Sequence, residues 1–235
     1  MRLLSPSYRD SKAPQAIGSV PVHFLHVRKT GGTAVIEALR PLADRYHLVL
    51  HEHATRLCHV PPDHQVVFFV RHPVTRFVSG FYSRLRRGLP RHHYEWSPAE
   101  SEAFGRFQTA NDLAEALSAR DPELAHCARE AMRNIAHLKY TYKDWFSGTD
   151  ELAARVDSIL LVGLQEQLDT DFEYLKKLLN LPETLLLPTD DVLSHRTPPQ
   201  FDRSLSPLSV HNLLQWYSED IHFYDYCVQL RATAA

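Results

Sequence analysis

Short apolar runs and longer amphipathic stretches alternate along this chain of 235 residues. The apolar runs predict buried strands at Val22–Val27, Val66–Val70 and Ser158–Val162, with a shorter strand at His47–Leu50. Helical periodicity predicts helices at residues 33–40, from 73 onward, at 112–119, 123–137 and 169–180, and two more between 208 and 230. This alternation predicts an α/β sandwich, in which helices flank a small central parallel sheet and the second half is helix-rich.

The composition favours one domain. Hydrophobic residues make up 44% of the chain, so we expect a single domain over residues 21–235 after a flexible arm at residues 1–20. Cys58, Cys127 and Cys227 fit neither a metal site nor a disulfide framework, which indicates a reducing, cytoplasmic location and no bound metal. The N-terminus has no apolar stretch long enough for a signal peptide, and no membrane span is expected.

Charge is distributed unevenly along the chain. The net charge of −2 argues against a protein that coats nucleic acid, so no nucleic-acid partner is expected. Residues 21–94 nevertheless hold 11 Lys or Arg against 4 Asp or Glu, a local charge of +7. This segment is either a solvated basic face or an electropositive cleft that concentrates an anionic ligand. The segment contains two predicted strand-to-helix junctions of a kind that binds anions, which favours the interpretation as a cleft.

The first junction reads HFLHV-RKTGGT-AVIEAL, from His23 to Leu39. Arg28 and Lys29 precede a predicted helix, whose N-terminal N–H groups and dipole favour negative charge. In the loop, Gly31 and Gly32 let the backbone approach an anion closely, and Thr30 and Thr33 offer hydroxyl groups. Lys29 stands alone among arginines, which fits a compact donor that follows a leaving group. An ordinary glycine turn is the alternative interpretation.

The second junction reads QVVFFV-RHPVTRFVSGFYSRLRR, from Gln65 to Arg87. Arg71 follows the strand, Pro73 suits the first helical position, and Ser79 lies in the second turn, so we expect Arg71 and Ser79 to face one pocket. Arg76 is expected to brace the turn rather than to contact a ligand. Two anion-binding junctions indicate a ligand with two separate phosphate-like groups.

A phosphotransferase that uses a metal nucleotide is disfavoured. A Walker A loop needs G-x-x-x-x-G-K-[ST], whereas Lys29 precedes the glycines here. The strand Val66–Val70 also ends in Arg71, where a magnesium-binding Asp would be expected.

The combination of motifs resembles the sulfotransferases that use 3′-phosphoadenosine-5′-phosphosulfate (PAPS). FLHVRKTGGT is similar to their 5′-phosphosulfate loop, and VRHPVTRFVSGFY to their 3′-phosphate motif, R-D-P-x-x-R-x-x-S. HEHAT, LLVGLQEQLDTDFEYLKKLL and LSHRTPPQFDR add likeness to the glycosaminoglycan branch, which includes the heparan sulfate 2-O- and 6-O-sulfotransferases. The likeness spans about Phe24 to Leu230. The chain departs from the family pattern at His72, where Asp is usual, and at Arg28, where Pro or an uncharged residue is frequent. We expect a soluble relative without the N-terminal membrane anchor of the Golgi enzymes.

The resemblance implies that the α/β sandwich is P-loop-like. It also implies in-line transfer of a sulfuryl group from PAPS to an acceptor hydroxyl. Lys29 is expected to stabilise the leaving phosphosulfate, and His53 to act as general base, with His51 and Glu52 as alternatives. The H-x-H spacing places His51 and His53 on opposite faces of an extended segment. The residues expected to bind PAPS are Arg28, Lys29, Thr30, Gly31, Gly32, Thr33, Ala34, Arg71, Ser79, Arg196 and Thr197.

The acceptor is open at this point. The resemblance implies a carbohydrate, while a lipid headgroup, a peptide tyrosine and a small metabolite are alternatives. The segment 92–96, with His92, His93, Tyr94 and Trp96, is either a wall for an acidic sugar or an ordinary helix end. A non-catalytic nucleotide- or glycan-binding module is the competing function.

Overall fold

A computed structural model describes residues 20–190 and 201–232, which divide into two compact units. Unit 1 contains the described residues 20–71, 142–189 and 222–232, and unit 2 contains 72–141, 190 and 201–221. Nearly all of the predicted arm lies outside the described residues. The expectation of one domain over residues 21–235 stays a prediction.

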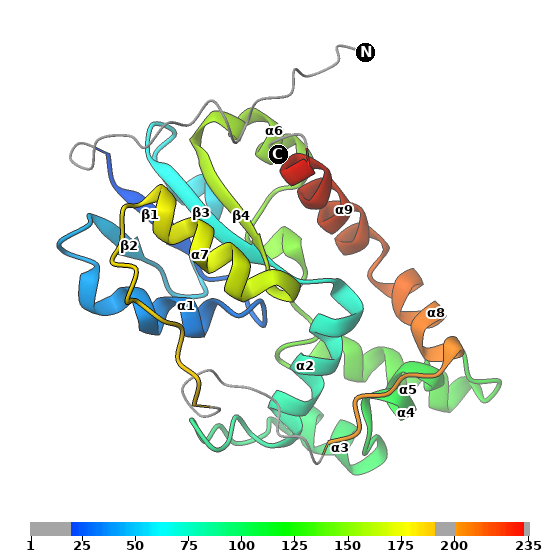
Figure 1. The fold of residues 1–235 in the computed structure, drawn as a ribbon. Helices are drawn as coiled ribbons and strands as arrows, with labels where there is room; N and C mark the ends of the chain where they lie inside the picture. Colours follow the sequence, from blue (N-terminus) through cyan, green and yellow to red (C-terminus); the bar gives the residue numbers. More distant parts are fainter. Residues whose placement is uncertain (1–19, 191–200, 233–235) are drawn as a thin grey trace. The chain divides into compact units, whose positions relative to one another are not determined.

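The described part of unit 1 is built on a sheet of four parallel strands in the order β2-β1-β3-β4 (Figure 1). The strands are β1 (Val22–Leu25), β2 (Leu48–Leu50), β3 (Gln65–Val70) and β4 (Ile159–Leu164). The central strands β1 and β3 pair from Val22 with Gln65 to Leu25 with Phe68. Their carboxyl ends therefore lie side by side, where ligands of parallel sheets bind.

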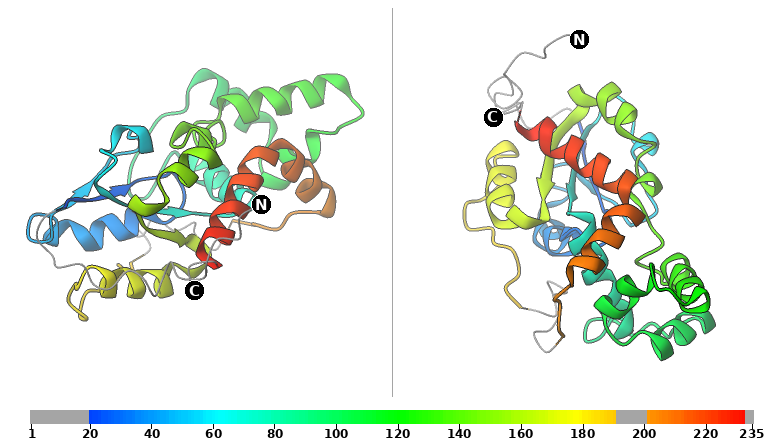
Figure 2. Two further views of the ribbon diagram at one scale, coloured as in Figure 1. Left: turned by 90° about the horizontal axis from the view of Figure 1, so that it is seen from above. Right: turned by 90° about the vertical axis from the view of Figure 1, so that its right-hand side faces the viewer.

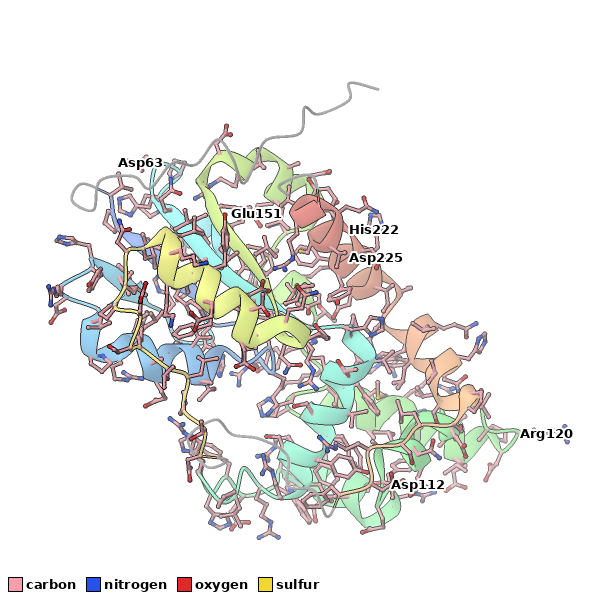
Figure 3. All side chains as sticks on the ribbon, in the orientation of Figure 1. Asp63, Asp112, Arg120, Glu151, His222 and Asp225 are labelled. Carbon is pink, nitrogen blue, oxygen red and sulfur yellow. The ribbon has the colours of Figure 1, made fainter. Side chains whose placement is uncertain are left out.

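The strand β3 is apolar from Val66 to Val70 because both of its faces are covered there. Its residues from Val66 to Val70 are all buried. The turn before β3 contains the labelled Asp63, which is exposed (Figure 3).

Helices cover both faces of the sheet. On one face, α1 (Gly32–Leu39) and α7 (Leu168–Leu178) pack against a cluster that contains Phe24 and Phe69. On the other face, Phe68 contacts Phe146, with ring centroids 4.7 Å apart, and Phe146 stacks on Phe223 of α9 (Ser218–Ala232). Figure 2 shows α7 and α9 on opposite sides of the sheet. The predicted sandwich with a small flanked parallel sheet is confirmed.

Short elements complete the described chain of unit 1. They are α6 (Thr149–Ala154) and the 3-10 helices η1 (Arg40–Leu42), η2 (Leu57–His59), η3 (Tyr142–Asp144), η4 (Val156–Ser158) and η5 (Gln165–Gln167).

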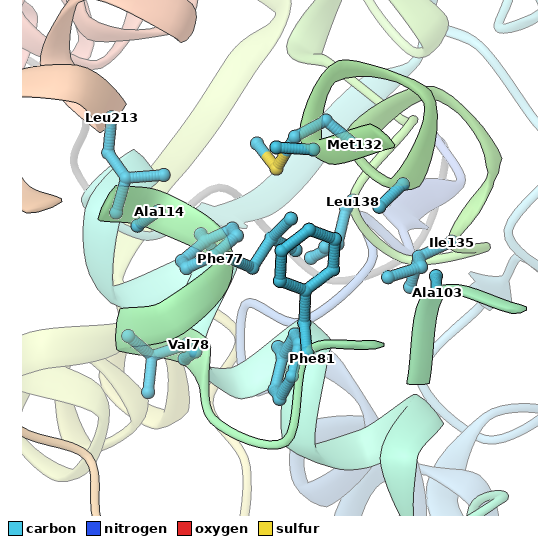
Figure 4. Close-up of a cluster of buried hydrophobic side chains, with 14 of the residues drawn as sticks. Phe77, Val78, Phe81, Ala103, Ala114, Met132, Ile135, Leu138 and Leu213 are labelled. Carbon is cyan, nitrogen blue, oxygen red and sulfur yellow. The ribbon is translucent and has the colours of Figure 1, made fainter. Parts of the chain in front are cut away.

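Unit 2 is helical in its described residues. Its helices are α2 (Pro73–Leu85), α3 (Pro98–Arg106), α4 (Ala110–Ala116), α5 (Pro122–Asn134) and α8 (Pro207–Trp216). The apolar face predicted for α2 is buried, and Figure 4 shows Phe77, Val78 and Phe81 among side chains from the neighbouring helices. This core holds the helices that follow the second junction.

Helix boundaries differ from the predictions by a few residues, and local chemistry explains the shifts. The helix expected from Asp112 begins at Ala110 because Thr109 caps it and exchanges hydrogen bonds with Asp112 in a capping box. The helix expected to reach His137 ends at Asn134, since Ile135 has extended backbone angles.

Candidate functional site

The loop between β1 and α1 turns sharply through left-handed backbone positions. Lys29 (φ 65°) and Gly31 (φ 84°) both adopt this conformation, and Gly31 caps α1. Buried Thr30 lies between them, and its hydroxyl donates to the Val27 carbonyl at 3.0 Å. The Thr30 side chain therefore braces the loop, which leaves its backbone N–H as the group that could face an anion.

The two glycines are needed because side chains do not fit at their positions. A Cβ on Gly31 would lie 3.1 Å from the Leu168 side chain, and one on Gly32 would lie 2.7 Å from His26 Cδ2. The first N–H groups of α1 lack partners within the helix, and half-buried Arg28 and Lys29 precede them. The residues present thus fit the predicted anion site, although binding of a phosphosulfate there stays a prediction.

His53 lies against this loop through His26. Its Nδ1–H donates to the His26 carbonyl at 2.8 Å, and the two imidazole centroids are 3.8 Å apart. His26 Nε2 in turn lies 3.4 Å from the Thr33 hydroxyl, in the first turn of α1. Because a carbonyl can only accept, this contact places the proton of neutral His53 on Nδ1. Nε2 is then the basic nitrogen.

His53 is held in its neutral form. Burial lowers its pKa from 6.5 to about 4; the His26 hydrogen bond and Glu52 oppose this shift, and the charges of Arg28 and Lys29 strengthen it. At neutral pH the imidazole is therefore able to accept a proton.

His51 faces away from His26, as the H-x-H alternation predicts. Its Nε2 lies 2.7 Å from His23 Nδ1, and His23 Nε2 lies 2.8 Å from His64 Nδ1. His23 pairs within β1 near its start, and His64 directly precedes β3, so this imidazole chain sits toward the amino ends of the central strands. The structure thus brings His53, and not His51, to the loop between β1 and α1.

We expect mild acid to destabilise unit 1 through its histidines. Burial is the main cause that lowers the pKa of His23 and of His53 from 6.5 to about 4. Between these two pH values the unfolded chain therefore binds more protons than the folded chain. Stability is therefore full above pH 6.5 and falls as the pH drops toward 4. Each histidine contributes up to about 1.4 kcal/mol of unfolding free energy per pH unit in this window.

Urea unfolding at pH 7.0 and at steps down to pH 4.5 measures this effect. Buried Glu100 of unit 2 is the separate case: burial raises its pKa, but the hydrogen bonds from Arg84 outweigh this and lower the pKa from 4.5 to about 2. The stability that Glu100 contributes is therefore lost only as the pH falls below 4.5. An unfolding free energy that stays constant from pH 7.0 to 5.0 would contradict the histidine prediction.

Arg71 leaves β3 next to the end of β1, and its backbone is fixed on both sides. Its N–H donates to the Tyr142 hydroxyl at 2.8 Å, and the same hydroxyl donates to the Arg71 carbonyl at 2.6 Å. The predicted cation of the second junction thus starts from a defined position beside the loop of the first junction.

A model of the sulfotransferase family matches residues 19–227 of the chain. The chain belongs to the sulfotransferase family. Sulfuryl transfer is therefore its general chemistry, and the match applies to the family as a whole rather than to the heparan sulfate branch. No curated protein matches the chain.

The described part of this sulfotransferase holds neither a membrane-spanning helix nor a metal cluster. Across residues 20–190 and 201–232, no helix is long and apolar enough to cross a bilayer. The same residues contain no group of three or more His, Cys, Asp or Glu side chains arranged to hold a metal ion.

The remaining nucleotide contacts predicted for the sulfotransferase, Ser79, Arg196 and Thr197, stay predictions. Ser79 lies in α2 of unit 2 and is half-buried. Arg76, which was expected to brace the turn, forms an ion pair within unit 2: its guanidinium lies 2.5 Å from buried Asp220 and donates to the Tyr140 carbonyl at 2.8 Å. Arg196 and Thr197 lie outside the described residues.

Part of the arginine-rich segment serves the fold of the sulfotransferase. Buried Arg84 forms a bidentate pair with Glu100 at 2.7 Å, and the Trp96 indole donates to the Arg84 carbonyl at 2.7 Å. Trp96 is thus a helix-end brace, whereas Tyr94 is 58% exposed. His92 and His93 are exposed beside Tyr94 and stay candidates for the acceptor wall.

Sequence reasoning did not single out three residues that contact the predicted site residues: His26, Tyr142 and Trp145. His26 lies inside the motif and carried a signal, because it directly precedes the loop that the motif identified. Tyr142 and Trp145 carried none, since the residues they bind are 71 and 92 positions away.

Proposed function

We propose that this sulfotransferase uses PAPS as donor and transfers its sulfuryl group to a carbohydrate hydroxyl. The observation that carries the proposal is the contact between His53 and His26. It places a neutral base, with its free lone pair on Nε2, against the loop whose cations and helix N-terminus suit a phosphosulfate.

The proposed reaction is an in-line displacement at sulfur. His53 Nε2 takes the proton of the acceptor hydroxyl as its oxygen bonds to sulfur, and the bond from sulfur to the 5′-phosphate oxygen breaks. Lys29 stabilises the charge that grows on that leaving oxygen, and adenosine 3′,5′-bisphosphate departs. Arg71 binds the 3′-phosphate, which anchors the donor and does not react. The base supplies proton transfer, while the loop supplies charge stabilisation.

Two finer assignments belong to the same proposal. We place the chain closest to the glycosaminoglycan branch, supported by the order of its two motifs and by the HEHAT segment that carries His53. We also propose a cytoplasmic location, supported by the free thiols of Cys58, Cys127 and Cys227.

Thermal unfolding with nucleotides tests the donor assignment. Adenosine 3′,5′-bisphosphate at 100 times its Kd is expected to raise Tm by about 5–10 °C, while ATP with Mg²⁺ gives a much smaller shift. A rise in Tm with ATP and none with the bisphosphate would instead favour a phosphotransferase that uses a metal nucleotide. Incubation with [³⁵S]PAPS and desulfated heparin, chondroitin, a tyrosine peptide or a hydroxylated lipid then tests the acceptor. Bisphosphate binding without transfer to any of them would favour a non-catalytic binding module.

A further inference from the structure

A short segment after α5, residues 142–146, contacts both proposed ends of the donor site. We call it the η3 segment, since it begins with η3 (Tyr142–Asp144). Its members Tyr142, Trp145 and Phe146 are all buried in unit 1. None of them belongs to either motif of the sequence.

The first contact fixes Arg71. The Tyr142 hydroxyl accepts from the Arg71 N–H at 2.8 Å and donates to the Arg71 carbonyl at 2.6 Å. One phenol thus satisfies both polar backbone groups of the residue that directly follows β3. These two bonds fix the backbone position from which the Arg71 side chain extends.

The second contact fixes His53. The Trp145 indole N–H donates to the His53 carbonyl at 2.8 Å, and the Trp145 carbonyl accepts from the Leu57 N–H, also at 2.8 Å. Trp145 therefore ties two points of the connection that carries His53 from β2 to η2. Trp145 bonds the backbone of His53, while the imidazole of His53 bonds the His26 carbonyl.

The η3 segment is itself rigidly held. The Tyr142 carbonyl accepts from the N–H groups of Trp145 and Phe146 at 3.0 and 2.9 Å, which closes a tight turn. The rings of Tyr142 and Phe146 stack on Phe223 with centroids 4.9 and 5.0 Å away, and Phe146 packs on β3 through Phe68. A displacement at one end would therefore be transmitted to the other.

We propose that Tyr142 and Trp145 are positioning residues that set the spacing between the 3′-phosphate anchor Arg71 and the base His53. The inference rests on the proposed function, because it assumes those roles for Arg71 and His53. In-line transfer requires the donor and the base to be placed together within fractions of an ångström. The η3 segment provides that registration from outside the two motifs.

Nucleotide selectivity tests the Tyr142 arm without any acceptor. Tyr142→Phe keeps the ring and removes the hydroxyl, so affinity for adenosine 3′,5′-bisphosphate is expected to fall about threefold to tenfold by calorimetry. Affinity for adenosine 5′-phosphate, which lacks the 3′-phosphate, should not change. In an Arg71→Ala background, Tyr142→Phe should add no further loss, since its effect acts through Arg71.

Histidine titration by NMR tests the Trp145 arm. Trp145→Phe removes the indole donor, which loosens the backbone of His53 and exposes its ring, so the pKa of His53 is expected to rise from about 4 toward 6.5. His23 serves as the internal reference. Its pKa is also about 4, and its ring nitrogens bond to His51 and His64 rather than to Trp145. If the pKa of His53 stayed at about 4 in a folded Trp145→Phe variant, the positioning role of Trp145 would be wrong.

Tyr217→Phe is the matched control. Tyr217 is a buried tyrosine of unit 2 whose hydroxyl donates to the Leu138 carbonyl at 3.0 Å. Its replacement should lower Tm but leave both nucleotide affinities and the pKa of His53 unchanged. Equal losses for both nucleotides in Tyr142→Phe would show a general structural role and overturn the inference.

Failure of the positioning role and failure of the donor assignment give different results. If Arg71→Ala loses bisphosphate selectively and Tyr142→Phe does not, Arg71 keeps its role and the positioning role fails. If wild-type protein does not bind the bisphosphate, the donor assignment itself fails, and the inference with it.

Discussion

Replacing His53 with Asn is expected to lower sulfuryl transfer from PAPS by about 10²–10⁴-fold and to leave bisphosphate affinity unchanged. The Asn amide can still donate to the His26 carbonyl, as His53 Nδ1 does at 2.8 Å, but it has no basic nitrogen to replace Nε2. Loss of transfer in this variant therefore reports on proton removal rather than on the position of the loop. Transfer of ³⁵S to the accepting polysaccharide and calorimetry with the bisphosphate measure the two quantities.

His51→Ala is the competing variant. It removes the contact with His23 and is expected to reduce stability while most of the transfer activity is kept. If His51→Ala abolished transfer and His53→Asn did not, the base would be His51. The pH profile gives an independent check, since kcat/KM should stay level from pH 8 down to about 5 and fall as His53 protonates near its pKa of about 4.

Replacing Arg71 with Ala is expected to weaken bisphosphate binding by about 1.5–3 kcal/mol, which is roughly 10–150-fold in Kd. The 3′-phosphate would lose a charge-assisted partner, and the proposal assigns this guanidinium no contact with the adenosine 5′-phosphate half. Arg71→Lys should recover part of the loss, because lysine keeps the charge but not the fork that binds two oxygens.

Adenosine 5′-phosphate is the control ligand for this variant. Its affinity should be the same in wild type and Arg71→Ala. Unchanged bisphosphate affinity, or an equal loss for both nucleotides, would remove Arg71 from the 3′-phosphate site.

Features of the fold that depend on neighbouring residues were predictable from the sequence. The apolar run of β3 and the glycines before α1 identified both junctions, because burial on two faces and a left-handed turn each restrict residue type locally. The alternation of His51 and His53 also predicted that the two rings point apart.

Features that depend on distant residues were not predictable. The sequence offered two histidines and a Glu as bases, and the contact of His53 with the His26 carbonyl, which supports the proposal of His53, has no signal in it. Trp96 was a candidate sugar contact, yet its indole is used by the Arg84 carbonyl. Hydrogen bonds between residues this far apart follow from packing, and a single sequence carries no periodic signal for them.

The imidazoles of His23, His51 and His64 form a chain with two hydrogen bonds, and counting its protons has a consequence for the fold. Each bond holds one proton, because one nitrogen must donate and the other accept. Burial lowers the pKa of His23 to about 4, so at neutral pH its ring carries one proton, and when one of its nitrogens donates the other must accept. The two bonds are therefore coupled through His23: reversing one reverses the other. The amino ends of the central strands are thus tied by one joint hydrogen-bonding unit rather than by two independent bonds.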